Sequence, residues 1–71
     1  MNKNKYKYKY LITYTYTRGN NVLKGNNYVS VPKKLNTSER IDNLKKLLAS
    51  YQDVSSERII IDFIYKVKKI S

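Results

Sequence analysis

A strict alternation of side chains over residues 5–17 constrains the fold of this chain more than any other feature. Tyrosines and one isoleucine take every second position, with lysines, threonines and one leucine between them. This period of two, built from strand-favouring residues, predicts a β-strand with two chemically different faces. At about 3.3 Å a residue the run would span roughly 43 Å, whereas a compact chain of this length is roughly 28 Å across. We therefore expect a paired strand from Tyr8 to Thr17 and a flexible basic arm over residues 1–7.

The next segment combines turn residues with a short apolar centre. Two similar tetrads, at 18–21 and 24–27, contain both glycines of the chain and flank Val22 and Leu23. Gly and Asn adopt the left-handed backbone angles that turns require. The pattern predicts a hairpin connection over residues 18–27, with a short strand at its centre, and a short second strand from Tyr28 to Val31. Because Pro32 cannot donate to a ladder, this strand is expected at a sheet edge.

A helix follows, with Asn36 or Thr37 as its N-cap and Glu39 near the positive end of its dipole. Apolar residues recur at spacings of three and four, which predicts an amphipathic helix ending near Gln52. The expected core-facing stripe consists of Ile41, Leu44, Leu47, Leu48 and Tyr51.

The last strand is predicted from Arg58 to Val67, and its apolar character is typical of an inner strand. Uninterrupted alternation would place Ile59, Ile61, Phe63, Tyr65 and Val67 on one face and Ile60, Asp62, Ile64, Lys66 and Lys68 on the other.

These elements define one α+β domain of ββαβ topology over residues 1–71. A right-handed return through the helix puts the last strand beside the first. The expected sheet is three-stranded and antiparallel, in order 2-1-3, with one helix packed on one face and the other face open.

Two faces of the first strand compete for the core. If the tyrosines pack on the helix, the lysine and threonine face lies open and can track phosphates. If the tyrosines lie outside, they form a stacking platform for bases. Leu11 with three threonines would make a thin core, so the sequence favours tyrosines inside.

The formal charge is +10, and its distribution is uneven. Residues 1–34 carry eight basic side chains and no acidic one. Lys, Asn, Ile and Tyr, which have codons made of A and T alone, supply 35 of the 71 residues, so genome composition explains the abundance of lysine and tyrosine. It does not explain the absence of acidic residues from one half. A field of this kind attracts nucleic acid, acidic protein faces or anionic lipid surfaces.

The candidate partner-binding residues are the basic side chains of the first half, their expected neighbours on the last strand, and the first two tyrosines of the alternating run. They are Lys5, Lys7, Lys9, Arg18, Lys24, Lys33, Lys34, Lys66, Lys68, Tyr6 and Tyr8. Ile60 and Ile64 beside Leu11 on an open sheet would also suit a homodimer.

The residue inventory argues against catalysis. The sequence has no histidine and no cysteine, and its five carboxylates follow no spacing of a metal site or a glycosidase pair. Neither glycine belongs to a phosphate-loop pattern. We expect no enzyme, no cofactor and no small-molecule substrate. Without cysteines, a signal peptide or an apolar run long enough to span a membrane, the expected location is the cytoplasm and no membrane partner is expected.

The run Tyr10–Tyr16, the helix-opening segment Leu35–Glu39 and the closing segment Ile59–Phe63 resemble the small accessory proteins of phages and mobile elements of AT-rich Gram-positive bacteria. The resemblance implies a non-catalytic protein that inhibits a host defence nucleoprotein, as anti-CRISPR proteins do, by occupying its surface or its nucleic acid in the host cytoplasm. It carries no functional residue over. The alternatives are a salt-sensitive nucleic-acid-binding module and a small dimeric phage structural or assembly protein.

Overall fold

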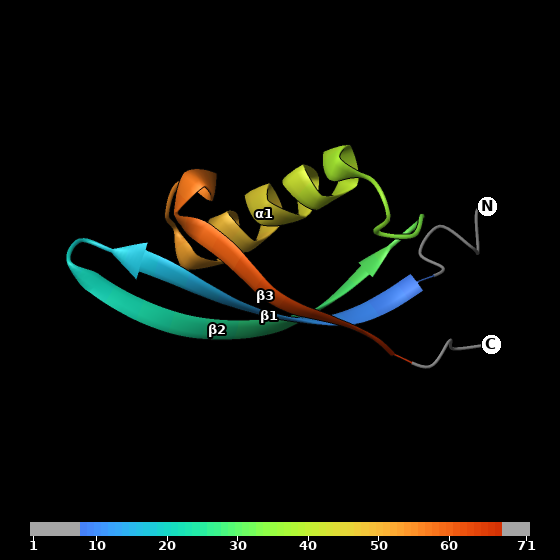
Figure 1. Ribbon diagram of the computed structural model, residues 1–71, viewed down its shortest axis with the longest axis horizontal. Coiled ribbons are helices and arrows are strands. Elements are labelled where there is room, and N and C mark those ends of the chain that lie inside the picture. Colours follow the sequence, from blue (N-terminus) through green and yellow to red (C-terminus); the bar gives the residue numbers. More distant parts are fainter. Residues whose placement is uncertain (1–7, 68–71) are drawn as a thin grey trace.

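A computed structural model describes residues 8–67 of the chain. Its elements are β1 (Tyr8–Arg18), β2 (Asn21–Val31), α1 (Ser38–Gln52), the short 3-10 helix η1 (Ser56–Arg58) and β3 (Ile59–Lys66). The strands form one sheet in the order β2-β1-β3, and β1 runs antiparallel to both neighbours. Figure 1 shows α1 lying across one face of the sheet while no element of the described chain covers the other. The predicted ββαβ fold is confirmed.

The first two strands form one long hairpin. Arg18 pairs with Asn21, so the loop consists of Gly19 and Asn20 alone, and Gly19 has a φ of 60°. A glycine with positive φ at the first loop position is typical of a type II′ turn, whose twist matches that of the strands. The predicted short second strand is wrong: β2 runs unbroken for 11 residues, all paired with β1. The second tetrad is therefore strand, since Gly25 lies opposite Tyr14.

The molecule is elongated, with extents of 44 × 21 × 20 Å. A strand of 11 residues, about 36 Å long at 3.3 Å a residue, fits along the longest axis. The expectation of a compact body is wrong in this respect, although the paired strand does begin at Tyr8 as predicted. The expected arm over residues 1–7 lies outside the described residues.

The tyrosine face of β1 forms the core. Tyr10, Ile12, Tyr14 and Tyr16 are each at most 8% exposed, which confirms the arrangement that the sequence favours. Their buried partners come from the helix and from both edge strands, namely Val29, Leu44, Leu48, Ala49 and Ile59.

The helix begins and ends where the sequence predicts. The Thr37 side chain accepts a hydrogen bond from the Arg40 backbone N–H at 3.2 Å, and Asp53 closes the helix in the left-handed conformation with a φ of 58°. The buried stripe is rotated from the predicted one. Ala49 is buried with Leu44 and Leu48, while Tyr51 is half exposed. The sheet is narrow and twisted, so a 15-residue helix buries only a thin stripe against it.

A β-bulge in β3 changes which residues face the helix. Ile61 lies opposite Tyr14 and Phe63 lies opposite Thr13, so Asp62 is an extra residue without a partner on β1. The predicted continuous alternation is wrong beyond this point, because one inserted residue exchanges the two faces of a strand. Ile64 and Lys66 thus pair with the buried face of β1, whereas Phe63 and Tyr65 turn to the uncovered face. The prediction of an inner strand is also wrong, since β3 is an edge.

Candidate nucleic-acid interface on the uncovered sheet face

The uncovered face of the sheet, called the open face below, is built on alternate residues of β1. These are Lys9, Leu11, Thr13, Thr15 and Thr17. Each has a lateral neighbour on β2, and most have one on β3, so the side chains form rows across the sheet. Cross-strand neighbours in such rows lie about 4.5–5.5 Å apart and interact directly.

Aromatic side chains occur in two adjacent rows. Leu11 pairs with Tyr28 on β2 and with Tyr65 on β3, so a tyrosine flanks it on each side. The next row contains Phe63 opposite Thr13, and the rings of Phe63 and Tyr65 are stacked with centroids 5.9 Å apart. Tyr28, Phe63 and Tyr65 are 62%, 61% and 51% exposed. Three solvent-accessible rings on one sheet face form an exposed apolar surface, and such surfaces often mark binding sites.

Positive charge borders the aromatic rows. The Lys9 ammonium lies 5.2 Å from the centroid of the Tyr28 ring, a cation–π arrangement that keeps both groups on the open face. Val67, the last described residue, donates its backbone N–H to the Lys9 carbonyl at 2.9 Å. The described chain thus begins and ends at the same end of the sheet. Residues 8–67 hold ten basic and five acidic side chains, so half of the net charge of +10 belongs to the five lysines beyond them.

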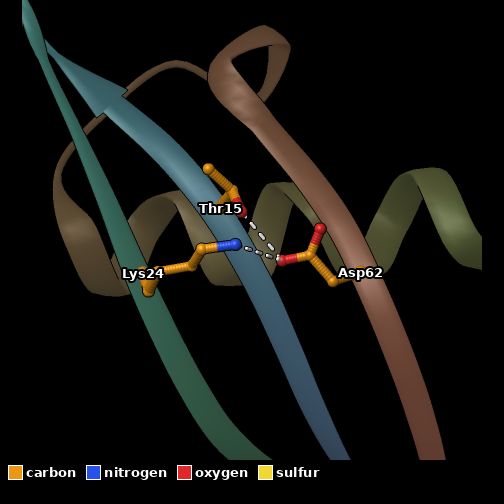
Figure 2. A network of polar contacts seen from close by, with 3 residues as sticks. All are labelled: Thr15, Lys24 and Asp62. Atoms are coloured by element: carbon orange, nitrogen blue, oxygen red, sulfur yellow. Dashed lines mark hydrogen bonds and ion pairs between the residues drawn. The ribbon is translucent and has the colours of Figure 1, made fainter.

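A polar contact between β2 and β3 crosses the open face at Thr15 of β1, in the row next to the aromatic rows. Figure 2 shows Lys24 from β2 and Asp62 from β3 converging over Thr15 of β1. The Thr15 hydroxyl donates to Asp62 Oδ2 at 2.8 Å, and Lys24 Nζ lies 3.7 Å from the same oxygen. Lys24 is 78% exposed, so this ion pair contributes little to stability, about 0–1 kcal/mol. Together with the Thr15 hydrogen bond, it places the Asp62 carboxylate on the open face.

The structure brings only part of the predicted site together. Lys9 and Lys24 lie on the open face, whereas Lys66 pairs with Tyr10 on the helix-covered face. Lys33 and Lys34 follow β2 in the loop before α1, at the end of the sheet where β1 begins. The remaining predicted residues Lys5, Lys7, Lys68 and Tyr6 lie outside the described residues.

Two predicted residues have structural roles. Tyr8 is half-buried and packs against the core beside Val31. The Arg18 guanidinium donates to the carbonyl of Gln52, the last residue of α1, and lies 5.8 Å from the centroid of the Tyr16 ring. A cation at this position complements the negative end of the helix dipole, which gives Arg18 a role in holding the helix on the hairpin.

Sequence reasoning missed the three exposed rings. Tyr28, Phe63 and Tyr65 were absent from the predicted site, since strict alternation put the last two on the same face as Ile59. One signal was present: Asp62 is the lone charged residue in an otherwise apolar run from 59 to 65. An acidic residue inside such a run is compatible with a bulge that leaves it unpaired.

Two further observations concern membrane insertion and metal binding. Helix α1 is neither long enough nor apolar enough to cross a membrane, and within residues 8–67 no cluster of three or more carboxylates could hold a metal ion.

Comparison with protein-family models, with curated proteins and with solved structures finds no match to this chain.

Proposed function

We propose that this protein is a non-catalytic module that binds single-stranded nucleic acid on the open face. The observation that carries the proposal is the row Tyr28–Leu11–Tyr65, with Phe63 stacked beside Tyr65 and Lys9 over Tyr28. Unstacked bases bind to aromatic side chains on open sheets in this manner. A duplex hides the faces of its bases and cannot use such rings.

The net charge of the chain and the positions of its terminal segments also support single-stranded nucleic acid as the partner. The net charge of +10 favours polyanions, and the lysine-bearing segments at both termini join the described chain at neighbouring points, Tyr8 and Val67. A strand lying across the open face could then place bases on the rings and phosphates near Lys9. Stacking of this kind tolerates any base, since every base has a π-face.

The biological setting is a separate matter. Inhibition of a host defence nucleoprotein stays a prediction, and it would be one use of nucleic-acid binding in the cytoplasm of a host cell. The homodimer and the virion-component alternatives also stay predictions. A monomer at the concentrations used for binding would argue against both, and light scattering measures this directly.

The first test compares two tyrosines of equal exposure. Tyr65 is 51% exposed on the open face and Tyr51 is 50% exposed on α1. We expect Tyr65→Ala to weaken binding to short uridine and thymidine strands roughly 5- to 150-fold, the range for loss of one stacked base. Tyr51→Ala should leave affinity unchanged. Fluorescence anisotropy with labelled strands gives both values, and equal effects of the two substitutions would refute the stacking platform.

The second test concerns charge. Affinity should fall steeply with salt, and Lys9→Ala should reduce the slope of log affinity against log salt by about 1, the effect of one lost phosphate contact. Lys46→Ala, an exposed lysine on α1, is the matched control. The triple variant Lys5→Ala, Lys7→Ala and Lys9→Ala should flatten the slope further. A slope that does not differ between wild type and triple variant would exclude these lysines from the interface.

A further inference from the structure

The β-bulge in β3 forms one side of a pocket with a mixed polar and apolar lining, next to the stacked rings. The pocket has a volume of about 460 Å³, which falls within the roughly 300–1,000 Å³ typical of small-ligand sites. Side chains from all three strands line it, namely Thr13, Lys24, Asn26, Asp62 and Phe63. An aromatic side chain beside both hydrogen-bond donors and hydrogen-bond acceptors is the composition that a single nucleobase requires.

Asp62 is the acceptor of this pocket. Its Oδ2 atom already interacts with the Thr15 hydroxyl and Lys24 Nζ, and no described residue donates to its Oδ1 atom. The side chain is 27% exposed, so it is accessible yet held in place from β1 and β2. A carboxylate has about four acceptor sites, so Asp62 keeps capacity for two further donors.

A second polar group lies unused on the pocket wall. The Thr13 hydroxyl oxygen is buried and has no hydrogen-bond partner among the described residues. Buried polar atoms are nearly always paired, and each exception calls for a physical reason. Because this oxygen is enclosed by its neighbours, a ligand in the pocket could pair with it only after those side chains move.

The arrangement of donors and acceptors selects among the bases. Two adjacent donors would fill both open acceptor sites of Asp62, and only guanine offers two adjacent donors on its Watson–Crick edge, as the N1–H and the N2 amino group. Adenine and cytosine place an unprotonated ring nitrogen beside their amino group, and uracil and thymine flank one N–H with two carbonyls. Each of these would bring an acceptor against the carboxylate. Guanine O6, next to N1–H, can in addition accept from Lys24.

We propose that the Asp62 pocket binds a guanine base of a single-stranded nucleic acid. The Asp62 carboxylate accepts from N1–H and the N2 amino group, Lys24 donates to O6, and the exposed ring of Phe63 stacks on the base. This inference rests on the proposed binding of single strands and adds a base preference to it. The 2′-hydroxyl plays no part in these contacts, so guanine in RNA and in DNA is expected to bind in the same way.

The experiment measures the affinity of labelled uridine and thymidine strands that carry one central guanine, adenine, cytosine or inosine. We expect guanine to bind roughly 5- to 150-fold more tightly than adenine or cytosine, the range of discrimination for one bidentate pair. Inosine lacks the N2 amino group and should lose much of the gain. Because this comparison uses only wild-type protein, it does not depend on how a variant folds.

Two matched variants assign the preference to Asp62. Asp62→Asn replaces one carboxylate oxygen by a donor and should abolish the preference while retaining affinity for unsubstituted strands. Asp42→Asn removes the same charge from the exposed surface of α1 and should keep the preference. Equal binding of all four bases by wild type, or a guanine preference that survives in Asp62→Asn, would overturn the guanine pocket and leave the stacking platform standing. If no single strand binds, both proposals fail.

Discussion

The ring of Tyr14 lies directly over the backbone of Gly25 in the neighbouring strand. A Cβ atom placed on Gly25 would come within 2.8 Å of the ring atom Cζ and 2.9 Å of the hydroxyl oxygen. The ring cannot easily move aside, because Tyr14 is fully buried and its hydroxyl is held by Asn27 and Gln52. The glycine thus gives the largest fully buried side chain the space that it needs.

Gly25→Ala should therefore destabilise the protein, by about 1–3 kcal/mol, as overpacking of a core does. A destabilising effect would be informative, because replacement of glycine by alanine at an unconstrained strand position raises the free energy of unfolding. Urea unfolding followed by circular dichroism gives the free energy of unfolding. Ser30→Ala, at an exposed position of the same strand, is the control. Unchanged or higher stability of Gly25→Ala would show that the ring is free to shift.

The Tyr14 hydroxyl connects three elements, since it donates to Asn27 Oδ1 on β2 and accepts from Gln52 Nε2 of α1 at 2.9 Å. Tyr14→Phe keeps the ring but leaves two part-buried polar groups unpaired, so we expect a loss of about 1–3 kcal/mol in unfolding free energy. Tyr51→Phe alters an exposed ring and serves as control. A loss equal to that of the control would mean that solvent replaces both bonds.

The C-terminal end of α1 offers a stabilising substitution. Asp53 has a φ of 58°, which costs least for glycine, and its negative charge lies at the negative end of the helix dipole. Asp53→Gly should raise the free energy of unfolding by about 0.5–1 kcal/mol. Asp53→Asn removes the charge and tolerates the same φ, so thermal melts of the two variants separate the electrostatic part from the conformational part. Destabilisation by both variants would contradict this account.

Deletion of Asp62 should convert the bulged strand into a regular one. The partners on each side keep their pairing, Ile61 with Tyr14 and Phe63 with Thr13, so the fold should persist with stability within about 1 kcal/mol of wild type. Nuclear Overhauser contacts between the Cα protons of Ile12 and Ile64, which form a non-hydrogen-bonded pair, report this register. Deletion of Ile60, a residue within the regular ladder, should disrupt pairing and is the contrasting variant. Loss of folding on removal of Asp62 would show that the bulge is required structurally.

Local signals located most of the elements. The alternation of β1, the cap predicted at Asn36 or Thr37 and the turn predicted at Gly19 depend on neighbours in sequence. The structure confirms each of them, with Thr37 as the cap. The turn predicted at Gly25 is wrong because the role of this glycine depends on Tyr14, which is distant in sequence but opposite in the sheet. The site was harder to predict, since Phe63 and Tyr65 reach the open face only through the bulge.

The sequence by itself determined the strand order, the helix position and the tyrosine core, because side-chain periodicity and apolar content dictate which faces are buried. It also determined the positive charge, which is additive over residues. Only the tertiary structure decided which rings are exposed. A single unpaired residue, Asp62, reverses the two faces of β3, and whether a strand absorbs an extra residue depends on its pairing with a partner rather than on its own composition.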